Sequence, residues 1–297
     1  MEFVRQNSIS TKDLLTNIAI TATKALLLEV SATPKPGLVD RHNTGAHRDM
    51  DILTFQTSAM AISPFFYRLI EFGMQHRNFE PEELLKEARE IGKQAEKAMF
   101  CATGGVNTHK GAIFSGGILC LAYGYLGEYA VDGDLLQETC GRIAAPVMGD
   151  LKKLDGGKAI TAGERLYLEH GVLGIRGEAA EGFPTVFQTA VPVMRNLLLK
   201  GYSLNDAGIL TLIHIMAALP DTNVMHRSSY EEAVALQNRM KSIADSKPEE
   251  RDYLQILEEL DPDFIRRNIS PGGCADLLAM TYFVVEMEEV YSWLYTS

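Results

Sequence analysis

Basic residues are too few in this sequence to form the surface of a nucleic-acid-binding protein. The 297 residues include 28 Lys and Arg against 39 Asp and Glu, which gives a formal net charge of −11. Affinity for nucleic acid depends on a basic surface that releases counterions, so this class is disfavoured. A small polyanionic substrate stays compatible with the composition, because a few cations and a divalent metal ion can make a local positive site on an acidic protein.

Cysteines and uncharged runs are also scarce. Cys101, Cys120, Cys140 and Cys274 lie far apart in apolar contexts, which argues against a disulfide framework or a metal cluster and predicts reduced core thiols. The N-terminal residues lack a basic region followed by an apolar core, so we expect no signal peptide and a cytoplasmic location. The longest uncharged run, Gly111–Gly127, is interrupted by glycines and is of marginal length for a bilayer, so we expect a buried helix there.

Linkers, charge blocks and internal repeats are missing as well, so we expect one domain spanning residues 1–297. The alternation typical of strands is almost absent. Apolar residues instead recur at three- and four-residue steps along most of the chain. The sequence therefore predicts an all-α fold, a single compact domain of roughly ten packed helices with Gly- and Asp-rich functional loops.

Capping signals and chain breaks predict where these helices lie. Ser10 with Asp13 is typical of a capping box and opens a helix to about Val30. Further helices are expected over about 50–73, 81–101, 110–125, 134–154 and 184–199, the last kinked at Pro192. Two more helices are expected to begin at the caps Ser203 with Asp206 and Ser228 with Glu231. A charged helix or pair of helices is expected over 248–268, and Ser270-Pro271 opens a last helix toward Trp293.

The segment Thr33–Asp51 is the connection richest in reactive side chains. Its two prolines fix the backbone, and Gly37 and Gly45 allow the close approach of a ligand or of another chain segment. Its cations are Lys35, Arg41 and Arg48, and its carboxylates, which could hold a metal ion or act as a base, are Asp40, Asp49 and Asp51. A plain helix–helix connection with solvated charges is the alternative, but the density of reactive groups favours a functional site.

Two further connections suggest anion binding. Gly104–Gly111 precedes an apolar helix, whose backbone N–H groups could bind an anion with help from Lys110. The order differs from a P-loop, and a glycine-rich turn capped by Asn107 or Thr108 is the alternative. Gly171–Pro184 places an arginine between glycines, which suits bidentate phosphate binding as well as a surface loop.

The last two connections suggest a metal site. Asp221-Thr222-Asn223 with Arg227, and 270–276 with Asp276, offer the oxygen ligands that Mg²⁺ prefers. Both aspartates could instead be helix caps or first-turn residues favoured by the helix dipole. Motifs of zinc hydrolases and serine esterases are absent.

Taken together, these segments resemble the triphosphoribosyl-dephospho-coenzyme A synthase family. The resemblance is carried by 33–40, Asn43, 45–50, 105–111, 176–178, 221–223 and 270–276, and so covers most of the chain after about residue 20. It implies an all-helical transferase that joins the 5-triphosphoribosyl group of ATP to the 2′-hydroxyl of 3′-dephospho-coenzyme A, releasing adenine. It also implies a need for a divalent cation, expected to be Mg²⁺, and a product passed to a separate acyl-carrier-protein transferase that serves citrate lyase or, in a sister branch, malonate decarboxylase.

This chemistry assigns provisional roles to the residues. Glycosyl transfer passes through an oxocarbenium-like state, which calls for a carboxylate base and for cations on the phosphates. We predict Asp49 or Asp40 as the base, Asp221 and Asp276 as Mg²⁺ ligands, Lys35, Arg48, Lys110 and Arg176 on the phosphates, and Asn107 and His109 on ribose or base. The other predicted substrate-binding residues are Gly37, Asn43, His47, Gly105, Thr108, Glu178, Asn223, Arg227, Gly272 and Gly273.

Two other functions are compatible with the sequence. A Mg²⁺-dependent N-glycoside hydrolase of the ADP-ribose type would use water in place of the 2′-hydroxyl and would release adenine without dephospho-coenzyme A. A non-catalytic nucleotide-binding helical protein would release none. The sequence leaves the client enzyme and the oligomeric state open, a homodimer included, and we expect neither a nucleic acid nor a membrane as partner.

Overall fold

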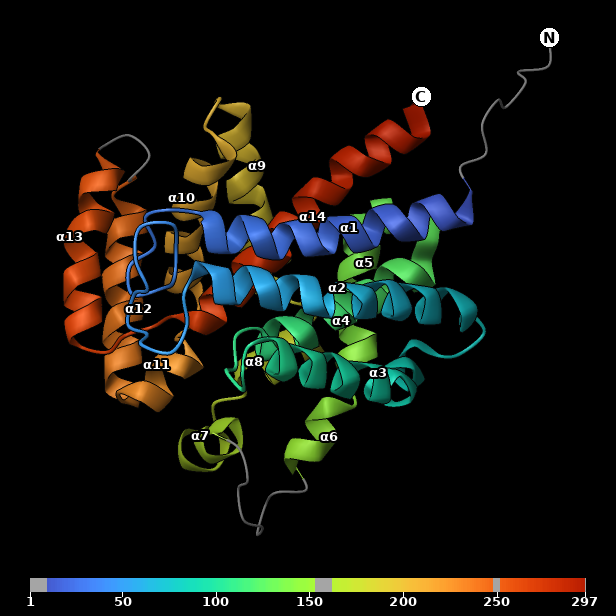
Figure 1. The fold of residues 1–297 in the computed structure, drawn as a ribbon, viewed down its shortest axis with the longest axis horizontal. Helices are drawn as coiled ribbons and strands as arrows, with labels where there is room; N and C mark the ends of the chain where they lie inside the picture. The colour runs from blue at the N-terminus through green and yellow to red at the C-terminus, as the bar shows by residue number, and fades with distance from the viewer. Residues whose placement is uncertain (1–9, 153–161, 248–251, 297) are drawn as a thin grey trace.

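The computed structural model describes residues 10–152, 162–247 and 252–296, all of them in helices or their connections (Figure 1). The long helices are α1 (Thr11–Ser31), α2 (Ile52–Gln75), α3 (Pro81–Ala102), α4 (Lys110–Leu126), α10 (Leu204–Ala218), α12 (Tyr230–Asp245), α13 (Tyr253–Arg266) and α14 (Gly272–Thr296). The shorter ones are η1 (Gly127–Val131), α5 (Gly133–Ala144), α6 (Val147–Lys152), α7 (Ala162–His170), α8 (Gly174–Ala180), η2 (Thr185–Ala190), α9 (Val191–Leu199) and α11 (Thr222–Arg227). The all-α prediction is confirmed, since no strand occurs within these ranges.

Two of the four helix starts predicted from caps, at Ser10 and Ser203, are confirmed by the capping hydrogen bond, whereas α14 begins at Gly272, two residues after the predicted cap Ser270. The Ser10 side chain accepts a hydrogen bond from the backbone N–H of Asp13 at 3.1 Å and begins α1. Ser203 begins α10 in the same way. The cap predicted at Ser228 is wrong by one residue, because Ser229 accepts the bond from Glu232 that begins α12.

Two predicted helices are divided where proline interrupts them. The helix expected over 134–154 ends at Ala144, and α6 begins only after Pro146, because proline lacks the N–H that a continuous helix needs. Residues 153–154 of the expected range lie outside the described part. The kink expected at Pro192 takes the form of η2, a turn of π-helix directly before α9. Such divisions give more helices than the ten expected. The region expected as a helix over 248–268 is α13, and residues 248–251 lie outside the described part.

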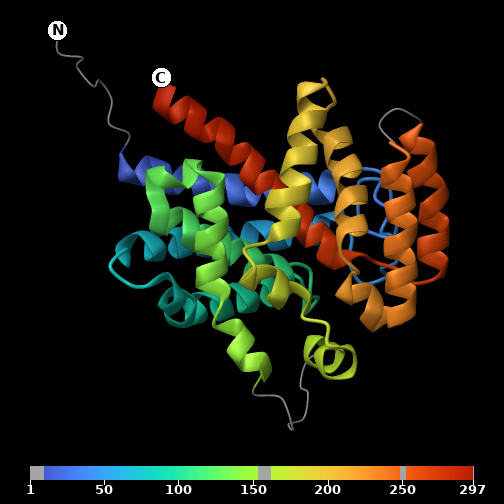
Figure 2. The ribbon, with the colours of Figure 1, turned by 180° about the vertical axis from the view of Figure 1, so that it is seen from behind.

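A single contiguous cluster of buried apolar side chains joins the helices from α1 to α14. α1 packs against α2 and α14, α2 packs against α3 and α4, and α10 packs against α12. Figures 1 and 2 show α14 running diagonally across the molecule, behind α1 in Figure 1 and in front of it in Figure 2, with α12 and α13 side by side at one end. The N-terminal part of α14 is thereby brought close to the end of α1 and the start of α4.

The prediction of a buried helix over 111–127 is confirmed by α4. Its contact with α2 is close enough to require glycine at both positions of approach: a Cβ atom at Gly73 would lie 2.3 Å from the carbonyl oxygen of Leu121, and one at Gly124 would lie 2.0 Å from that of Ile70. Direct backbone contact between the two helices therefore explains Gly73 of α2 and Gly124 of α4.

α1 is the one helix among the described residues that is long and apolar enough to cross a membrane. Over half of that stretch, 56%, is buried inside the molecule, against α2 and α14. Core packing therefore accounts for its apolar residues. Of the four free cysteines, three are buried as predicted, whereas Cys101 is exposed.

Candidate active site

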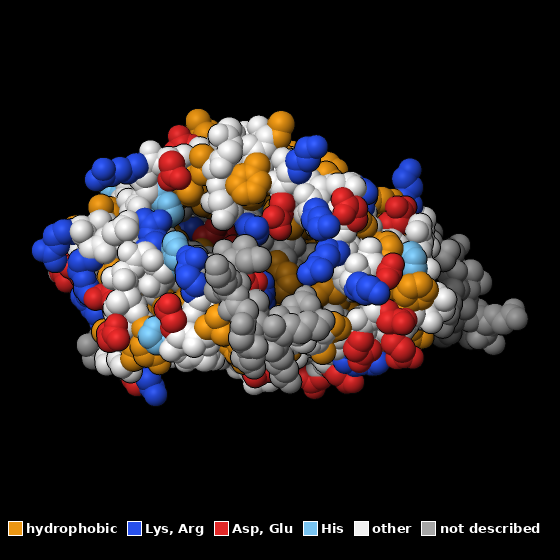
Figure 3. Space-filling model, turned by 90° about the horizontal axis from the view of Figure 1, so that it is seen from below, with side chains coloured by type: hydrophobic (Ala, Val, Ile, Leu, Met, Phe, Trp, Pro, Cys, Tyr) orange, Lys and Arg blue, Asp and Glu red, His pale blue; other side chains and the backbone are white. Residues whose placement is uncertain are grey.

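A cavity of about 280 Å³ lies where the end of α1 meets the starts of α2, α4 and α14, with α11 along one side. Seen from the side of α7 and α11, the surface is hollowed, with Lys, Arg and His side chains around the hollow and acidic side chains within it (Figure 3). The volume is near the lower limit for ligand pockets, enough for part of a nucleotide.

Four of the five predicted connections contribute to this cavity. The predicted residues that line it are His47 and Asp49; Asn107, Thr108, His109 and Lys110; Asn223 and Arg227; and Gly272 and Asp276. The first and last of these residues, His47 and Asp276, are 229 positions apart in the sequence, and folding brings them together.

The fifth predicted connection, Gly171–Pro184, does not contribute. Arg176 contacts Glu164 of α7 at 3.5 Å, and Glu178 accepts a hydrogen bond from the backbone N–H of Thr185 at 2.7 Å. Burial raises the pKa of Glu178. Both side chains therefore serve the packing of α7, α8 and η2, outside the cavity lining.

Asp40, one of the two predicted bases, stabilises the loop that contains it. Its Oδ2 accepts the backbone N–H of Lys35 at 2.9 Å, and its Oδ1 accepts those of His42 and Asn43 at 2.7 and 3.0 Å. The side chain is buried and is outside the cavity lining. Both oxygens are thus occupied by backbone donors, so the geometry gives Asp40 a structural role.

Asp261 of α13 anchors the same loop. Its carboxylate accepts hydrogen bonds from the Gly37 N–H at 2.8 Å and from the Asn43 side chain at 2.7 Å. Gly37 has a φ of +71°, and a Cβ atom there would lie 2.2 Å from the carbonyl oxygen of Ile269. Gly37 and Asn43 were predicted to bind substrate, but the structure uses them to dock the loop against α13.

Lys35, a predicted phosphate ligand, points inward. Only 1% of its surface is exposed. Its Nζ donates to the carboxylate of Glu29 and, at 2.5 Å, to the backbone oxygen of the same residue. Lys35 is outside the cavity lining, whereas Glu29 is part of it. Of the other predicted residues, Arg48, Gly105 and Gly273 are also outside the lining.

Asp221, a predicted metal ligand, joins two helices. Its Oδ1 accepts the backbone N–H groups of Asn223 and Val224 at 2.7 and 3.2 Å, and its Oδ2 accepts that of Cys274 at 2.7 Å. It therefore caps α11 and holds the first turn of α14, which is the alternative that the sequence left open. Burial raises the pKa of this carboxyl, and the hydrogen bond from Cys274 acts in the opposite direction. Gly273 makes the approach possible, since a Cβ atom there would lie 2.9 Å from Oδ2.

Asp276, the other predicted metal ligand, does line the cavity. It accepts a hydrogen bond from the backbone N–H of Ala112, in the first turn of α4. The contact requires Gly111, because a Cβ atom there would lie 1.9 Å from Oδ2. Burial, and then the nearby charges of Glu29 and Asp221, raise the pKa of Asp276 well above its usual value. The first turns of α4 and α14 are joined at this carboxylate.

His109 lines the cavity and carries a buried hydrogen-bond donor. The hydroxyl of Thr108 donates to Ser58 Oγ at 2.7 Å, which leaves the Ser58 hydrogen for His109 Nδ1, also at 2.7 Å. This chain places the imidazole proton on Nε2. Nε2 is buried and has no protein partner in the described part of the chain. Burial, and then the charge of Lys35, lower the pKa of His109 to about 3, so the ring is neutral.

The rim of the cavity carries His47, Asp49 and Arg227. His47 Nε2 lies 2.8 Å from Ser270 Oγ, and its Nδ1 lies 3.9 Å from Asp49 Oδ1. Burial and then the charge of Arg227 lower the pKa of His47. Burial also lowers the pKa of Arg227, which the charge of Asp49 opposes. Lys110 also lines the cavity; its side chain is half exposed and its Nζ lies 3.1 Å from Glu96.

Comparison with known proteins decides the family. Residues 15–294 match the model of the family described as ATP:dephospho-CoA triphosphoribosyl transferase. The chain belongs to this family. The predicted resemblance is thereby confirmed over most of the sequence.

Individual members of the family are also similar at the level of identity. A probable 2-(5''-triphosphoribosyl)-3'-dephosphocoenzyme-A synthase of Pectobacterium carotovorum is 44% identical over 92% of this chain and 89% of its own length. The synthase of Pectobacterium atrosepticum is 44% identical over 88% of this chain and 85% of its own length. A probable synthase of Streptococcus mutans is 36% identical over 95% of this chain and all of its own length. No solved structure matches the chain.

Several residues that line the cavity were not predicted from the sequence. Glu29 is the most important of them for the chemistry of this family. Glu29 is buried in the last turn of α1. It follows Ala25 and Leu26 at helical spacing, on the stripe of α1 that faces the core. A lone acid on an apolar stripe was the one signal in the sequence, and it belongs to no motif. His226, Phe55 and Ser270 also line the cavity.

The residues do not form a complete metal cage. Among the residues that the structure describes, no group of three His, Cys, Asp or Glu side chains could hold a metal ion. The predicted pair does not share an opening, because Asp221 is outside the lining. Mg²⁺ needs only one or two carboxylates when substrate phosphates and water complete its coordination. The cavity therefore fits a metal ion that arrives with a triphosphate, with Asp49 on the rim as an accessible carboxylate.

Proposed function

We propose that this protein transfers the 5-triphosphoribosyl group of ATP to the 2′-hydroxyl of 3′-dephospho-coenzyme A and releases adenine. Membership of the transferase family supports the reaction. The observation that carries the proposal is the cavity at which four separate polar connections meet. In this reaction the bond between ribose C1 and the adenine nitrogen breaks, and a bond between C1 and the 2′-oxygen forms.

The triphosphate binds at the rim in this proposal. Arg227 and Lys110 supply positive charge there, and the His47 ring supplies a hydrogen bond. Arginine suits phosphate because its donors match the geometry of two oxygens at once. The present contacts of Arg227 are with backbone oxygen atoms and an amide, at Ala46 and Asn268, so no carboxylate must be displaced from a direct bond.

The reacting ribose lies further inside. Asn107 and Asn223 face the cavity and can bind hydroxyl groups of the sugar. The Nε2–H of His109 is a buried donor in need of an acceptor, and a ring nitrogen of adenine or a ribose oxygen would provide one. Because the cavity is small, the rest of dephospho-coenzyme A would extend beyond the rim.

Mg²⁺ belongs to the proposal as the counter-ion of the triphosphate, with Asp49 as its protein ligand. When bound, it would neutralise phosphate charge. A carboxylate facing C1 is still needed to accept the hydroxyl proton, and the carboxylates on the lining are Glu29, Asp49 and Asp276.

The proposal extends to the setting in which the protein works. The chain acts as one domain in the cytoplasm, as a monomer or a homodimer. Its product is passed to a separate acyl-carrier-protein transferase and becomes the prosthetic group of the citrate lyase acyl-carrier subunit.

The test is chromatography of ATP, Mg²⁺ and dephospho-coenzyme A incubated with the protein, following adenine and the larger conjugate. We expect adenine and conjugate in equal amounts, and neither when dephospho-coenzyme A is left out. Adenine release from ATP alone would indicate an N-glycoside hydrolase. Binding of ATP with no adenine under any condition would indicate a non-catalytic protein. Either result would overturn the proposal.

A further inference from the structure

Glu29 occupies an unusual position for a carboxylate. It lies in the last turn of α1, with 8% of its side chain exposed, and it lines the cavity beside Leu26. An ionised carboxylate in such surroundings is costly unless a cation is bonded to it. Lys35 is that cation, and it is itself almost completely buried.

The pair leaves one oxygen of Glu29 free. Lys35 Nζ bonds to Oε1 and to the backbone oxygen of Glu29, which fixes the ammonium against the end of α1. Within the described residues Oε2 takes part in no hydrogen bond. Burial raises the pKa of Glu29, and the charge of Lys35 opposes that effect. Glu29 therefore lines the cavity with one carboxylate oxygen held by Lys35 and the other without a hydrogen bond from the described residues.

The other carboxylates near the cavity are less suited to act on a reacting atom. Asp49 lies on the rim with 63% of its side chain exposed, where water weakens electrostatic interactions. Asp40 and Asp221 are occupied by backbone donors. Asp276 holds the start of α4 and, among the described residues, has no bonded cation to keep it ionised.

We propose that Glu29 is the catalytic carboxylate that accepts the proton of the attacking 2′-hydroxyl, with Lys35 as its positioning residue. This inference rests on the proposed function. The 2′-oxygen forms its bond to ribose C1 as the bond from C1 to adenine breaks. The hydroxyl proton passes to Oε2 of Glu29, and the electron pair leaves with adenine, which takes a proton from water. Glu29 then returns its proton to solvent. A buried carboxylate also stabilises positive charge on the ribose more strongly than an exposed one.

The experiment compares three variants with the wild type. Glu29→Gln removes the base and keeps the shape. The double variant Glu29→Gln with Lys35→Met removes the whole ion pair, so that no lone buried charge remains and folding is preserved. Glu286→Gln is the matched control. Glu286 of α14 is a buried carboxylate that bonds to Lys24 of α1, the helix that also carries Glu29, and it lies outside the cavity lining.

We expect kcat for adenine release to fall by at least about 100-fold in both Glu29 variants, the usual contribution of a general base. The Kd for Mg²⁺-bound ATP, measured by calorimetry, should stay within about threefold of the wild type. The control should keep both values. Circular dichroism and thermal unfolding establish that each variant is folded.

Two results would overturn the inference. One is a folded double variant that keeps kcat within tenfold of the wild type. The other is a loss of affinity for Mg²⁺-bound ATP as large as the loss of kcat, which would make Glu29 a ligand of the metal or the substrate. A wild-type protein that releases no adenine would instead contradict the proposed function, so the two failures are distinguishable.

Discussion

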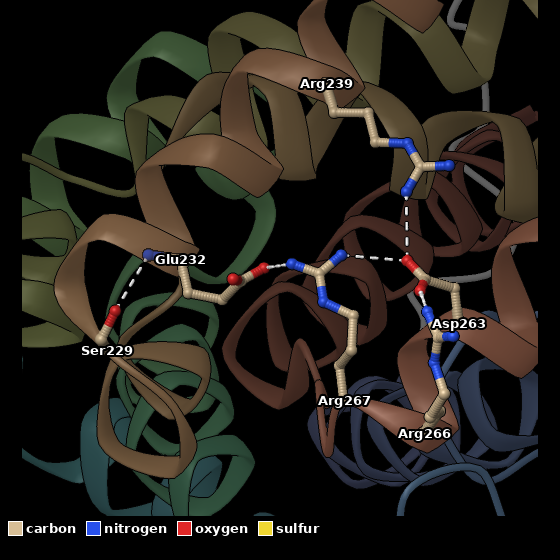
Figure 4. Close-up of polar contacts among 6 residues, drawn as sticks. All are labelled: Ser229, Glu232, Arg239, Asp263, Arg266 and Arg267. Atoms are coloured by element: carbon tan, nitrogen blue, oxygen red, sulfur yellow. Dashed lines mark hydrogen bonds and ion pairs between the residues drawn. The ribbon is translucent and has the colours of Figure 1, made fainter.

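Two clusters of paired charges in this molecule differ in their surroundings. One is the buried pair of Lys35 and Glu29 at the cavity. The other lies on the surface of α12 and α13, where Asp263 accepts bonds from Arg239, Arg266 and Arg267 (Figure 4). Arg266 is 76% exposed, whereas Lys35 is 1% exposed.

The difference in exposure determines what each cluster contributes. Exposed ion pairs are weakened by water and salt, and each is worth little even when several share one acceptor. A buried pair is expensive to form and more expensive to break, because the partner left behind is an unpaired charge away from water. The surface cluster has more bonds, but the buried pair should have the larger effect on folding and on function.

The strongest test of this comparison is Lys35→Met. The variant leaves Glu29 buried without its cation, so we expect the free energy of unfolding to fall by about 3–5 kcal/mol. Urea denaturation followed by circular dichroism measures the loss. Adding Glu29→Gln to the variant should restore most of the lost stability, because no charge then remains unpaired. If the double variant were as unstable as Lys35→Met, packing rather than charge would explain the loss.

Asp221→Ala should have the next largest effect. It removes the acceptor of three backbone N–H groups that join α11 to α14, and we expect a loss of about 2–3 kcal/mol. The matched control is Asp132→Ala, which removes an exposed N-cap from α5 and should cost about 1 kcal/mol.

The same pair of variants tests the predicted metal role. A residue that only held a metal ion would not destabilise the metal-free protein when removed. Equal stability of Asp221→Ala and wild type in EDTA would therefore contradict the structural role and favour a ligand.

Burial of His109 should make the free energy of unfolding depend on pH. Its pKa is about 3 in the folded protein against an ordinary value of 6.5 for the solvated side chain, so the unfolded chain binds more protons between these values. Stability conferred by the neutral ring is therefore complete above pH 6.5 and is lost as pH falls toward 3, at up to about 1.4 kcal/mol per pH unit.

The variant His109→Asn isolates this effect. The amide can keep the bond to Ser58 but does not titrate, so its stability should fall less steeply below pH 6.5. Glu29 and Asp276 act with the opposite sign, because raised carboxyl pKa values favour the folded state as pH falls. Their contribution is common to both proteins and cancels in the difference between the two unfolding curves. Parallel curves would show that His109 is not buried as a neutral ring.

The sequence predicted the helices and the meeting of connections better than the roles of single residues. Periodicity and caps locate α1, α4 and α10 because these signals are local. We could also predict that Asp49, His109 and Asp276 belong to one site. Connections rich in both glycine and reactive side chains are unusual in a helical protein, and such connections are expected to meet at a functional site.

Whether a given charged residue binds a ligand or stabilises the fold could not be predicted. Asp40, Asp221 and Lys35 have side chains that suit a substrate or a metal ion equally well. What they bond to depends on backbone groups that are distant in sequence, such as the N–H of Cys274, or on Glu29, which belongs to no motif. Burial and partners set the role of a charged side chain, and both are properties of the folded chain.

The smallest effect is expected on the surface cluster. Arg266→Ala removes an exposed partner of Asp263 while Arg239 and Arg267 remain bonded to it, so we expect a loss below about 0.5 kcal/mol. The loss should vanish in 1 M NaCl, where the screening length is about 3 Å. Urea denaturation at low and high salt measures both quantities. A loss of about 3 kcal/mol or more that persisted in salt would mean that the surface cluster stabilises the protein as much as the buried pair does. The contrast between the two clusters would then have to be sought in geometry rather than in exposure.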